Sequence, residues 1–171
     1  MPAGPVKVYV AAGSNVAPVE SLATALAALR ERFPDLVASP AYWNAAVGFA
    51  GDDFVNLAVG FTTRLPLAAL LTELHAVEAL CGRGRDEPKW AKRRMDLDVL
   101  LYGDLVGEFA GARLPRPDLV RRAFMLGPLA DIAPDTVHPT LGLTIAELWS
   151  RFDRAAHPMR RLGAPGPAAR P

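Results

Sequence analysis

The sequence predicts one domain that combines short strands with amphipathic helices. Short apolar runs rich in β-branched residues, such as Val6 to Ala12, have the length and composition of buried strands. Other segments, such as Pro18 to Phe33, repeat apolar residues at helical spacing. The chain has 171 residues and a hydrophobic content of 51%, which is enough for one buried core. We expect this domain to cover residues 1–156 and a disordered tail to follow over residues 157–171.

The first half of the chain holds three strand candidates and two helix candidates. The strands are expected at residues 6–12, 36–43 and 54–62, and the helices at residues 18–33 and 66–80. Pro34 ends the first helix, and Pro66 suits the first position of the second. The turn Gly13-Ser14-Asn15 lacks the lysine of a P-loop and the glycine spacing of a dinucleotide fingerprint, so we assign it no phosphate.

The second half begins with an apolar strand candidate at residues 95–101. A turn at Tyr102-Gly103-Asp104 and a short strand at residues 105–109 predict a hairpin with it. Residues 114–118 contain too many prolines for either regular element. A helix is expected over residues 124–132, and Thr144 can cap a last helix that runs to residue 152.

Two aspartates, Asp96 and Asp98, interrupt the apolar strand candidate. Aspartate is depleted in strands, and because strand side chains alternate between faces, both carboxylates share one face. The opposite face is expected in the core and carries Met95, Leu97, Val99 and Leu101. Carboxylates about 7 Å apart along a strand suit two divalent ions roughly 4 Å apart, and magnesium prefers such oxygen ligands. The alternative is an edge strand whose polar face meets water.

A basic segment directly precedes the aspartates. Residues 82–94 contain six cations, two glycines and a proline, which predicts a mobile loop. Arginine side chains match phosphate oxygens, and metals held by Asp96 and Asp98 would neutralise further phosphate charge. The combination indicates a nucleoside triphosphate as ligand. The alternative is a solvated, charged turn that binds nothing.

Further candidate ligand residues lie on other elements. Phe54 and Asn56 share a strand face and could hold a flat heterocycle by stacking and a hydrogen bond, unless both serve the core. His75 and Glu78 lie one turn apart on the second helix, where they either contact a ligand or form a surface pair. A second basic cluster, which could grip a triphosphate from the other side, consists of Arg116, Arg121 and Arg122.

Composition argues against several classes of protein. The net charge of +1 comes from 19 basic and 18 acidic residues, so the basic segments are local and do not indicate a general nucleic-acid coat. Cys81 is the single cysteine, which excludes an intramolecular disulfide, and the three histidines lack metal-ligand spacing. The sequence has no signal-peptide pattern and no apolar run of about 18 residues, so we expect a soluble, cytoplasmic protein.

With these residues laid out, the chain resembles the 6-hydroxymethyl-7,8-dihydropterin pyrophosphokinases of folate biosynthesis from Val8 to Trp149. The order and spacing of short motifs carry the resemblance, more than any single motif. These motifs are Ala12-Gly13-Ser14-Asn15, Phe54-Val55-Asn56, Glu78 before Gly82-Arg83, Trp90, Arg93 before Met95-Asp96-Leu97-Asp98, and Arg122-Ala123-Phe124-Met125-Leu126-Gly127-Pro128-Leu129.

The resemblance implies an α+β, ferredoxin-like fold in which helices pack on an antiparallel sheet. It also implies transfer of a diphosphate from ATP to the hydroxymethyl group of the pterin, with release of AMP. In that reaction Asp96 and Asp98 would hold two Mg²⁺ ions. Arg83 and Arg93 would stabilise the transferring group.

The other candidate site residues would bind the two substrates. His75, Glu78, Arg85, Trp90, Arg116 and Arg122 are assigned to the nucleotide side. On the pterin side, Asn56 would donate or accept a hydrogen bond while Phe54 and Phe124 stack on the two ring faces, and Val47 lies in the adjoining loop. The partners implied are small molecules, with no nucleic acid, no membrane and no obligate protein partner.

The chain departs from the family pattern at four places. Asn44-Ala45-Ala46 replaces the usual threonine and prolines, and Arg116 replaces a usual histidine. Asp52 stands where glutamine is common, and Gly111 stands where some members have arginine. Two alternatives therefore remain beside the transfer reaction. One is a diverged paralogue that binds nucleotide with altered pterin specificity or weak activity, and the other is a nucleic-acid-binding module.

Overall fold

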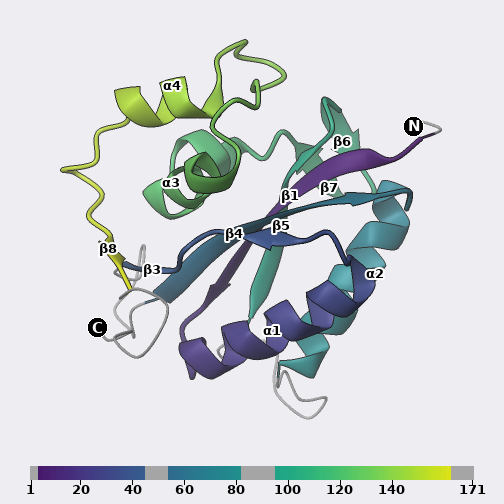
Figure 1. The fold of residues 1–171 in the computed structure, drawn as a ribbon. Coiled ribbons are helices and arrows are strands. Elements are labelled where there is room, and N and C mark those ends of the chain that lie inside the picture. The colour runs from purple at the N-terminus through teal and green to yellow at the C-terminus, as the bar shows by residue number, and fades with distance from the viewer. Residues whose placement is uncertain (1–3, 45–53, 82–94, 163–171) are drawn as a thin grey trace.

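An antiparallel sheet with helices on both faces forms the framework of the molecule (Figure 1). The computed structural model describes residues 4–44, 54–81 and 95–162. Within these ranges the main sheet has six strands in the order β5-β1-β4-β3-β8, with β2 paired to β4. They are β1 (Val6–Ser14), β2 (Val37–Ala38), β3 (Tyr42–Asn44), β4 (Phe54–Thr63), β5 (Asp96–Tyr102) and β8 (Arg160–Arg161). A separate two-stranded sheet consists of β6 (Gly107–Phe109) and β7 (Ala112–Leu114).

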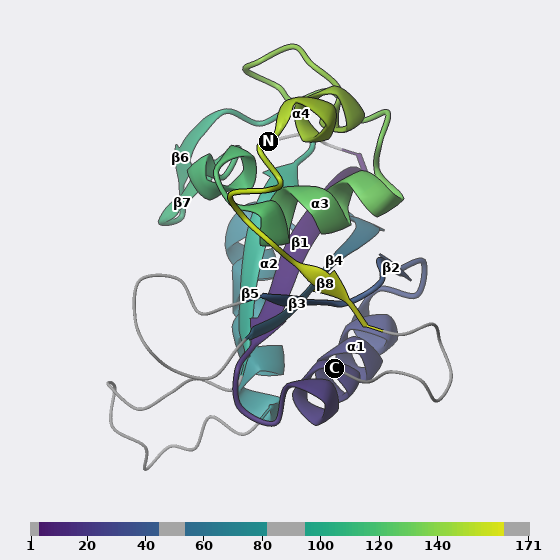
Figure 2. The same cartoon turned by 90° about the vertical axis from the view of Figure 1, so that its left-hand side faces the viewer.

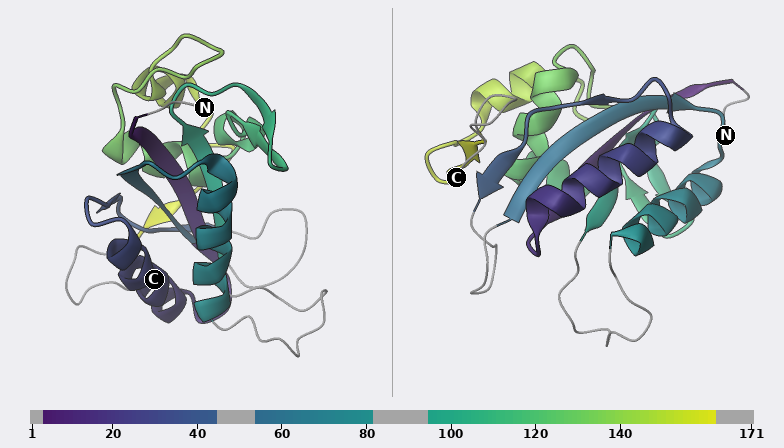
Figure 3. Two further views of the ribbon diagram at one scale, coloured as in Figure 1. Left: turned by 90° about the vertical axis from the view of Figure 1, so that its right-hand side faces the viewer. Right: turned by 60° about the horizontal axis from the view of Figure 1, so that its bottom comes forward.

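The helices divide between the two faces of the main sheet. They are α1 (Pro18–Arg32), α2 (Leu67–Leu80), the 3₁₀ helix η1 (Pro117–Val120), α3 (Ala123–Ile132) and α4 (Ile145–Arg151). Helices α1 and α2 cover one face, α3 covers the other, and α4 packs on α3 (Figures 1 and 3). None of the helices in the described ranges has both the length and the apolar character needed to cross a membrane.

Strand β1 lies between two apolar clusters. Val8 and Val10 pack toward α1 and α2, whereas Tyr9 and Ala11 join the cluster around α3. Because both faces are covered, nearly every position of β1 is buried, and the strand reads as a continuous apolar run. The predicted α+β, ferredoxin-like fold with an antiparallel sheet is confirmed.

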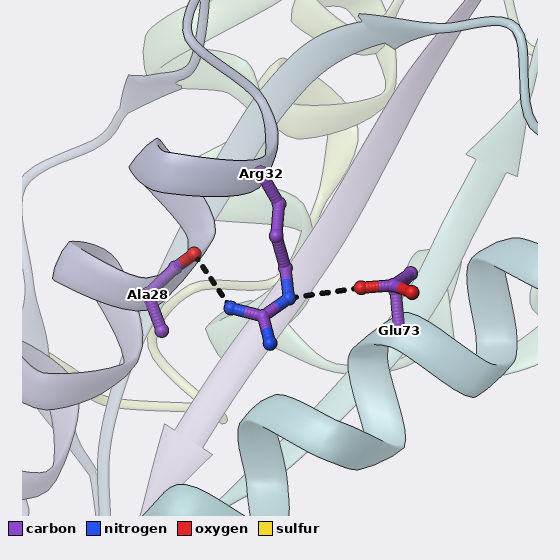
Figure 4. Close-up of polar contacts among 3 residues, drawn as sticks. All are labelled: Ala28, Arg32 and Glu73. Carbon is purple, nitrogen blue, oxygen red and sulfur yellow. Dashed lines mark hydrogen bonds and ion pairs between the residues drawn. The ribbon is translucent and has the colours of Figure 1, made fainter.

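An ion pair joins the two helices of the first face. Nε of Arg32, in the last turn of α1, donates to Oε1 of Glu73 on α2 at 2.9 Å (Figure 4). Its Nη1 donates to the carbonyl of Ala28 at 3.1 Å. Both charged side chains are partly exposed, so the pair adds at most about 1 kcal/mol. Burial of apolar residues such as Leu29 and Leu70 between the helices and the sheet stabilises this layer more than the ion pair does.

Strand β5 alternates between faces as the sequence predicts, up to Val99. Leu97 and Val99 enter the apolar cluster beneath α1 and α2. Asp96 and Asp98 line a cavity on the α3 face. The strand therefore presents its carboxylates to one layer of the molecule and its apolar side chains to the other.

The alternation breaks at a β-bulge. The register between β1 and β5 shifts at Tyr9 and Val10, which pair with Leu101 and Val99 and leave Leu100 as the extra residue. Leu100 and Leu101 consequently both join the cluster around α3. The prediction that Leu101 shares the core face of Leu97 is wrong for this reason.

The strand candidate at residues 36–43 is two short strands, β2 and β3, separated at Pro40. Proline lacks the N–H that a continuous ladder needs. Ser39 maintains the connection to β4, because its N–H donates to the carbonyl of Ala58 at 2.8 Å and its Oγ accepts from the N–H of Ala58 at 2.9 Å. The side chain of Ser39 thus replaces a missing backbone partner.

The predicted hairpin between β5 and residues 105–109 is wrong. Gly103 adopts a positive φ of 56°, the chain leaves the main sheet there, and β6 pairs with β7 instead. Outside this small sheet, the N–H of Arg116 donates to the carbonyl of Leu100 at 3.0 Å. The segment after β7, rather than residues 105–109, therefore runs beside the edge of β5.

Toward the C-terminus one prediction is confirmed and two are corrected. Thr144 caps α4, because its hydroxyl accepts the N–H of Glu147 and the carboxylate of Glu147 accepts the N–H of Thr144. Pro117 begins η1 in the stretch expected to lack regular structure, since proline suits the first helical position. Arg160–Arg161 pair with β3 as β8, which corrects the tail expectation for these two residues, whereas residues 163–171 lie outside the described ranges (Figure 2).

Candidate active site

The predicted carboxylates and aromatic residues meet in one cavity on the α3 face of the sheet. We call it the catalytic cavity after the role proposed for it below, and its volume is about 220 Å³. It is lined by Ala11, Gly13, Asn44, Phe54, Asn56, Asp96, Asp98, Arg116, Asp118, Phe124 and Met125. Among these, the predicted ligand residues are Phe54, Asn56, Asp96, Asp98, Arg116 and Phe124. Residues from β1, β3, β4, β5, the segment at η1 and α3 thus form a single pocket.

Small residues of β1 leave space beside the carboxylates. Gly13 lies opposite Asp96 in the β1–β5 pairing, and Ala11 lies opposite Asp98. Ala11 does not extend beyond Cβ, and at Gly13 the amide oxygen of Asn56 occupies the place of a Cβ, so the amide and the aspartates line the same cavity. The sequence assigns Gly13 to a turn, whereas the structure places it inside β1, which continues to Ser14.

Asp96 and Asp98 suit magnesium that is bound together with a polyphosphate. Both carboxylates are half-buried on one face of β5. Among the residues that the structure describes, no group of three or more His, Cys, Asp or Glu side chains could hold a metal ion. Mg²⁺ characteristically binds one or two carboxylates and completes its shell with water and substrate phosphates. The donor set therefore fits magnesium that arrives with a nucleotide, rather than a closed protein site.

Arg116 brings a positive charge against these carboxylates. Its Nη2 lies 3.6 Å from Oδ1 of Asp98. Its Nε is buried and has no hydrogen-bond partner within the described ranges. The backbone bond to Leu100 fixes the residue along the edge of β5. The guanidinium can therefore either neutralise Asp98 or contact a phosphate in the same cavity.

The fold divides the second basic cluster that the sequence predicts. Arg116 lines the catalytic cavity, whereas Arg121 lines only a second cavity, whose wall includes Pro117 and Val120 of η1. Arg122 precedes α3 as its N-cap residue and lines neither of these two cavities. Contact of Arg122 with a nucleotide stays a prediction.

Asn56 is held in place by its neighbours. Its Nδ2 donates to Oδ1 of Asn44, and both side chains are buried. Its Oδ1 lies beside Gly13, where a Cβ atom would overlap it. Phe54 and Phe124, from β4 and α3, line the same cavity. A fixed amide and two aromatic rings are suited to a flat, polar heterocycle.

Glu78 supports the carboxylates from behind. It is 8% exposed, and one carboxylate oxygen accepts the N–H of Leu97 at 2.7 Å. Burial raises the pKa of Glu78, and the charges of Asp96 and Asp98 act in the same direction. The bond from Leu97 opposes this increase in pKa. The surface-pair interpretation is wrong for Glu78, whereas a nucleotide contact of Glu78 or of the exposed His75 stays a prediction.

Sequence reasoning did not predict two polar residues of the wall of the catalytic cavity. Asn44 is noted there only as a departure from the family pattern, and Asp118 lies in a proline-rich stretch with no periodic signal. Neither position could be identified without the pairing of β3 with β4 and the course of η1. Five predicted ligand residues lie outside the described ranges, and their roles stay predictions: Val47, Arg83, Arg85, Trp90 and Arg93.

Comparisons with known proteins identify the family. Residues 9–134 match the family model described as 7,8-dihydro-6-hydroxymethylpterin-pyrophosphokinase (HPPK). Three relatives carry the name 2-amino-4-hydroxy-6-hydroxymethyldihydropteridine pyrophosphokinase. The protein of Pseudomonas aeruginosa is 43% identical over 134 residues, covering 75% of this chain and 82% of the relative. That of Synechocystis is 39% identical, covering 84% and 75%, and that of Haemophilus influenzae is 35% identical, covering 90% and 96%.

Solved structures agree with the fold. The wild-type HPPK-DHPS of Plasmodium falciparum with STZ-DHP superposes with a TM-score of 0.67 at 14% identity, covering 86% of this chain and 43% of that one. This chain thus spans less than half of that longer protein. The comparisons favour neither of the two alternatives drawn from the sequence. The chain therefore belongs to the 7,8-dihydro-6-hydroxymethylpterin-pyrophosphokinase family.

Proposed function

We propose that this chain transfers the β,γ-diphosphate of ATP to the hydroxymethyl group of 6-hydroxymethyl-7,8-dihydropterin, with the help of Mg²⁺, and releases AMP. One observation carries the proposal: a single cavity has paired carboxylates beside a pocket suited to a flat heterocycle. Family membership supplies the class of reaction. Because the co-substrate is ATP, we assign the reaction to the cytoplasm.

The pterin would bind at the end of the cavity formed by β4 and α3. Phe54 and Phe124 offer ring faces on which the heterocycle can stack. Asn56 offers an amide whose orientation is held by Asn44. A polar group fixed before the ligand arrives lowers the entropy cost of binding and improves discrimination among ring substituents.

The phosphates of ATP would lie along β5. Asp96 and Asp98 would hold Mg²⁺, which when bound would neutralise phosphate charge and orient the diphosphate that is transferred. Arg116 lies within reach of the same phosphates, because it already contacts Asp98. By family resemblance, Arg83 and Arg93 would add further positive charge from the preceding segment.

The transfer forms one oxygen–phosphorus bond and breaks another. The hydroxyl oxygen of the pterin attacks the β-phosphorus of ATP, and the bond from that phosphorus to the oxygen shared with the α-phosphorus breaks. AMP leaves with that oxygen, and the hydroxyl proton passes to solvent. Positioning and charge neutralisation supply most of the rate in such reactions, so the cavity needs no strong general base.

Product identification tests the proposal. The purified chain is incubated with ATP, Mg²⁺ and 6-hydroxymethyl-7,8-dihydropterin, and products are separated by chromatography and identified by mass. We expect AMP and the pterin diphosphate in equal amounts, and neither product when Mg²⁺ or the pterin is omitted. Formation of ADP and a pterin monophosphate would contradict the proposal. Parallel reactions with other pterin alcohols test for a paralogue with altered specificity.

A further inference from the structure

A second cavity lies beside the first, between the β6–β7 hairpin, η1 and the turn at residues 138–142. Its volume is about 320 Å³, which exceeds the 220 Å³ of the catalytic cavity. Charged and polar side chains in its wall come from Arg113, Arg116, Arg121, His138 and Thr140. Arg116 alone among the predicted ligand residues lines both cavities.

The wall of this second cavity is electropositive. Three arginines and one histidine line it, and no aspartate or glutamate does so among the described residues. The whole chain is nearly neutral, with 19 basic and 18 acidic residues, so this segregation is local. A concave surface that carries charges of one sign concentrates ligands of the opposite sign.

His138 is a fixed donor in this wall. The residue is 4% exposed, and its Nδ1 accepts the N–H of Thr140 at 3.3 Å and the N–H of Leu141 at 3.2 Å. Since these two N–H groups can only donate, Nδ1 carries no proton, the hydroxyl of Thr140 at 3.2 Å can only donate to it as well, and Nε2 carries the ring N–H. Nε2 has no hydrogen-bond partner within the described ranges and is not one of their fully buried unpaired atoms, so its N–H stays accessible to a ligand.

Apolar side chains stand at the same cavity. Val106 is 50% exposed and Leu141 is 51% exposed, and both line the wall. A free phosphate ion would not use these surfaces, whereas an organic phosphate would cover them. The wall therefore combines anion-binding groups with surface for an apolar or flat substituent.

We propose that the second cavity binds a phosphomonoester. The phosphate contacts Arg113, Arg121 and Nε2 of His138, and the organic group packs on Val106 and Leu141. This site goes beyond the diphosphate transfer and does not depend on it. Because Arg116 lines both cavities, a ligand in the second cavity lies next to a residue that contacts Asp98 in the first.

Phenyl phosphate is the probe, and neighbouring arginines provide matched variants. Arg121 lines the second cavity and Arg122 does not, although the two residues are adjacent in sequence. The full-length chain, labelled with ¹⁵N, is titrated with phenyl phosphate and followed by NMR. We expect saturable shifts at the amides of Gly107, Thr140 and Leu141. The Kd should rise at least fivefold in Arg121→Gln and stay within twofold of the native value in Arg122→Gln.

Three results would overturn the proposal. They are shifts that fail to saturate, shifts confined to catalytic-cavity residues such as Ala11 and Asp96, and equal weakening of binding in Arg121→Gln and Arg122→Gln. A second exposed variant, Arg113→Gln, should also weaken binding severalfold without unfolding the chain. Inorganic phosphate should bind at least fivefold more weakly than phenyl phosphate, and equal binding would contradict the role of Val106 and Leu141. Neither ATP nor pterin is present, so failure here is distinct from failure of the transfer assay.

Discussion

Substitutions of Glu78 should show whether its hydrogen bond to the backbone of β5 or its negative charge matters more for stability and turnover. The carboxylate accepts the N–H of Leu97, the residue between Asp96 and Asp98. Glu78→Leu removes this acceptor and leaves the N–H buried, whereas Glu78→Gln retains an oxygen of similar position and loses only the charge. The two variants therefore distinguish the hydrogen bond from the charge.

The magnitude follows from the burial of Leu97 and Glu78, which are 5% and 8% exposed. A buried donor without a partner costs about 1–3 kcal/mol. We expect Glu78→Leu to lower the free energy of unfolding by about this amount, which would be a considerable fraction of the roughly 5–15 kcal/mol typical of a domain. The loss would also release the backbone between Asp96 and Asp98, so turnover should fall more than in Glu78→Gln.

The dependence on pH has a defined sign. Burial raises the pKa of Glu78 above its ordinary value of 4.5, and Asp96 and Asp98 reinforce this shift. An acid with a higher pKa in the folded state stabilises the fold below its unfolded pKa, and this contribution is lost as pH rises through the folded pKa. As pH rises above 4.5, the native chain should therefore lose stability relative to Glu78→Gln.

Urea unfolding of the native chain, Glu78→Leu and Glu78→Gln from acid to neutral pH measures the loss of the hydrogen bond and the dependence on charge. Turnover is recorded on the same preparations. The reasoning would be refuted if Glu78→Leu matched Glu78→Gln in stability and in turnover. A constant difference in stability between the native chain and Glu78→Gln from acid to neutral pH would contradict the charge argument alone.

Three further predictions concern the catalytic cavity. Gly13→Ala places a Cβ against the amide oxygen of Asn56 and should displace this amide. In calorimetry, the affinity for the pterin should fall at least tenfold while the affinity for Mg²⁺-ATP changes less than twofold. Equal losses of affinity for both ligands would indicate a packing defect. Phe124→Ala removes one stacking surface and should cost about 1 kcal/mol of pterin binding in the same titration, and unchanged affinity would exclude stacking. Arg116→Gln removes a cation 3.6 Å from Asp98. The affinity for Mg²⁺ without nucleotide should therefore rise, while the affinity for ATP should fall. A fall in both affinities would contradict the role of Arg116 as a cation shared by Asp98 and the phosphates.

Local pattern was sufficient to predict the chemical face of β5. Alternation of side chains places Asp96 and Asp98 together, and the structure brings both to the cavity that also contains Phe54 and Asn56. The cap of α4 at Thr144 could likewise be predicted from the sequence, because a capping box involves residues only three positions apart.

Features that depend on contacts between distant parts of the chain could not be predicted from the sequence. The bulge at Leu100 exists because β5 pairs with β1, about 90 residues away in the chain, and it moves Leu101 to the other face. Residues 105–109 have strand-like composition, but composition does not specify a partner, and β7 rather than β5 takes that place. Arg121 and Arg122 are adjacent in sequence, yet only Arg121 lines the second cavity, since the course of the chain after η1 decides which side chain reaches it.

The central claim is that Asp96 and Asp98 of β5 hold the metal and the phosphates during transfer. Single-turnover formation of AMP tests this claim most directly. Asp118 provides the matched control, because it is a third carboxylate of the same cavity that does not belong to β5. With saturating ATP, Mg²⁺ and pterin, Asp96→Asn and Asp98→Asn should each slow AMP release by about 100-fold or more, because each loses charge needed to hold metal and phosphate. Asp118→Asn should stay within a few-fold of the native rate. Near-native rates in either β5 variant, or an equal loss in all three, would contradict the assignment of Asp96 and Asp98.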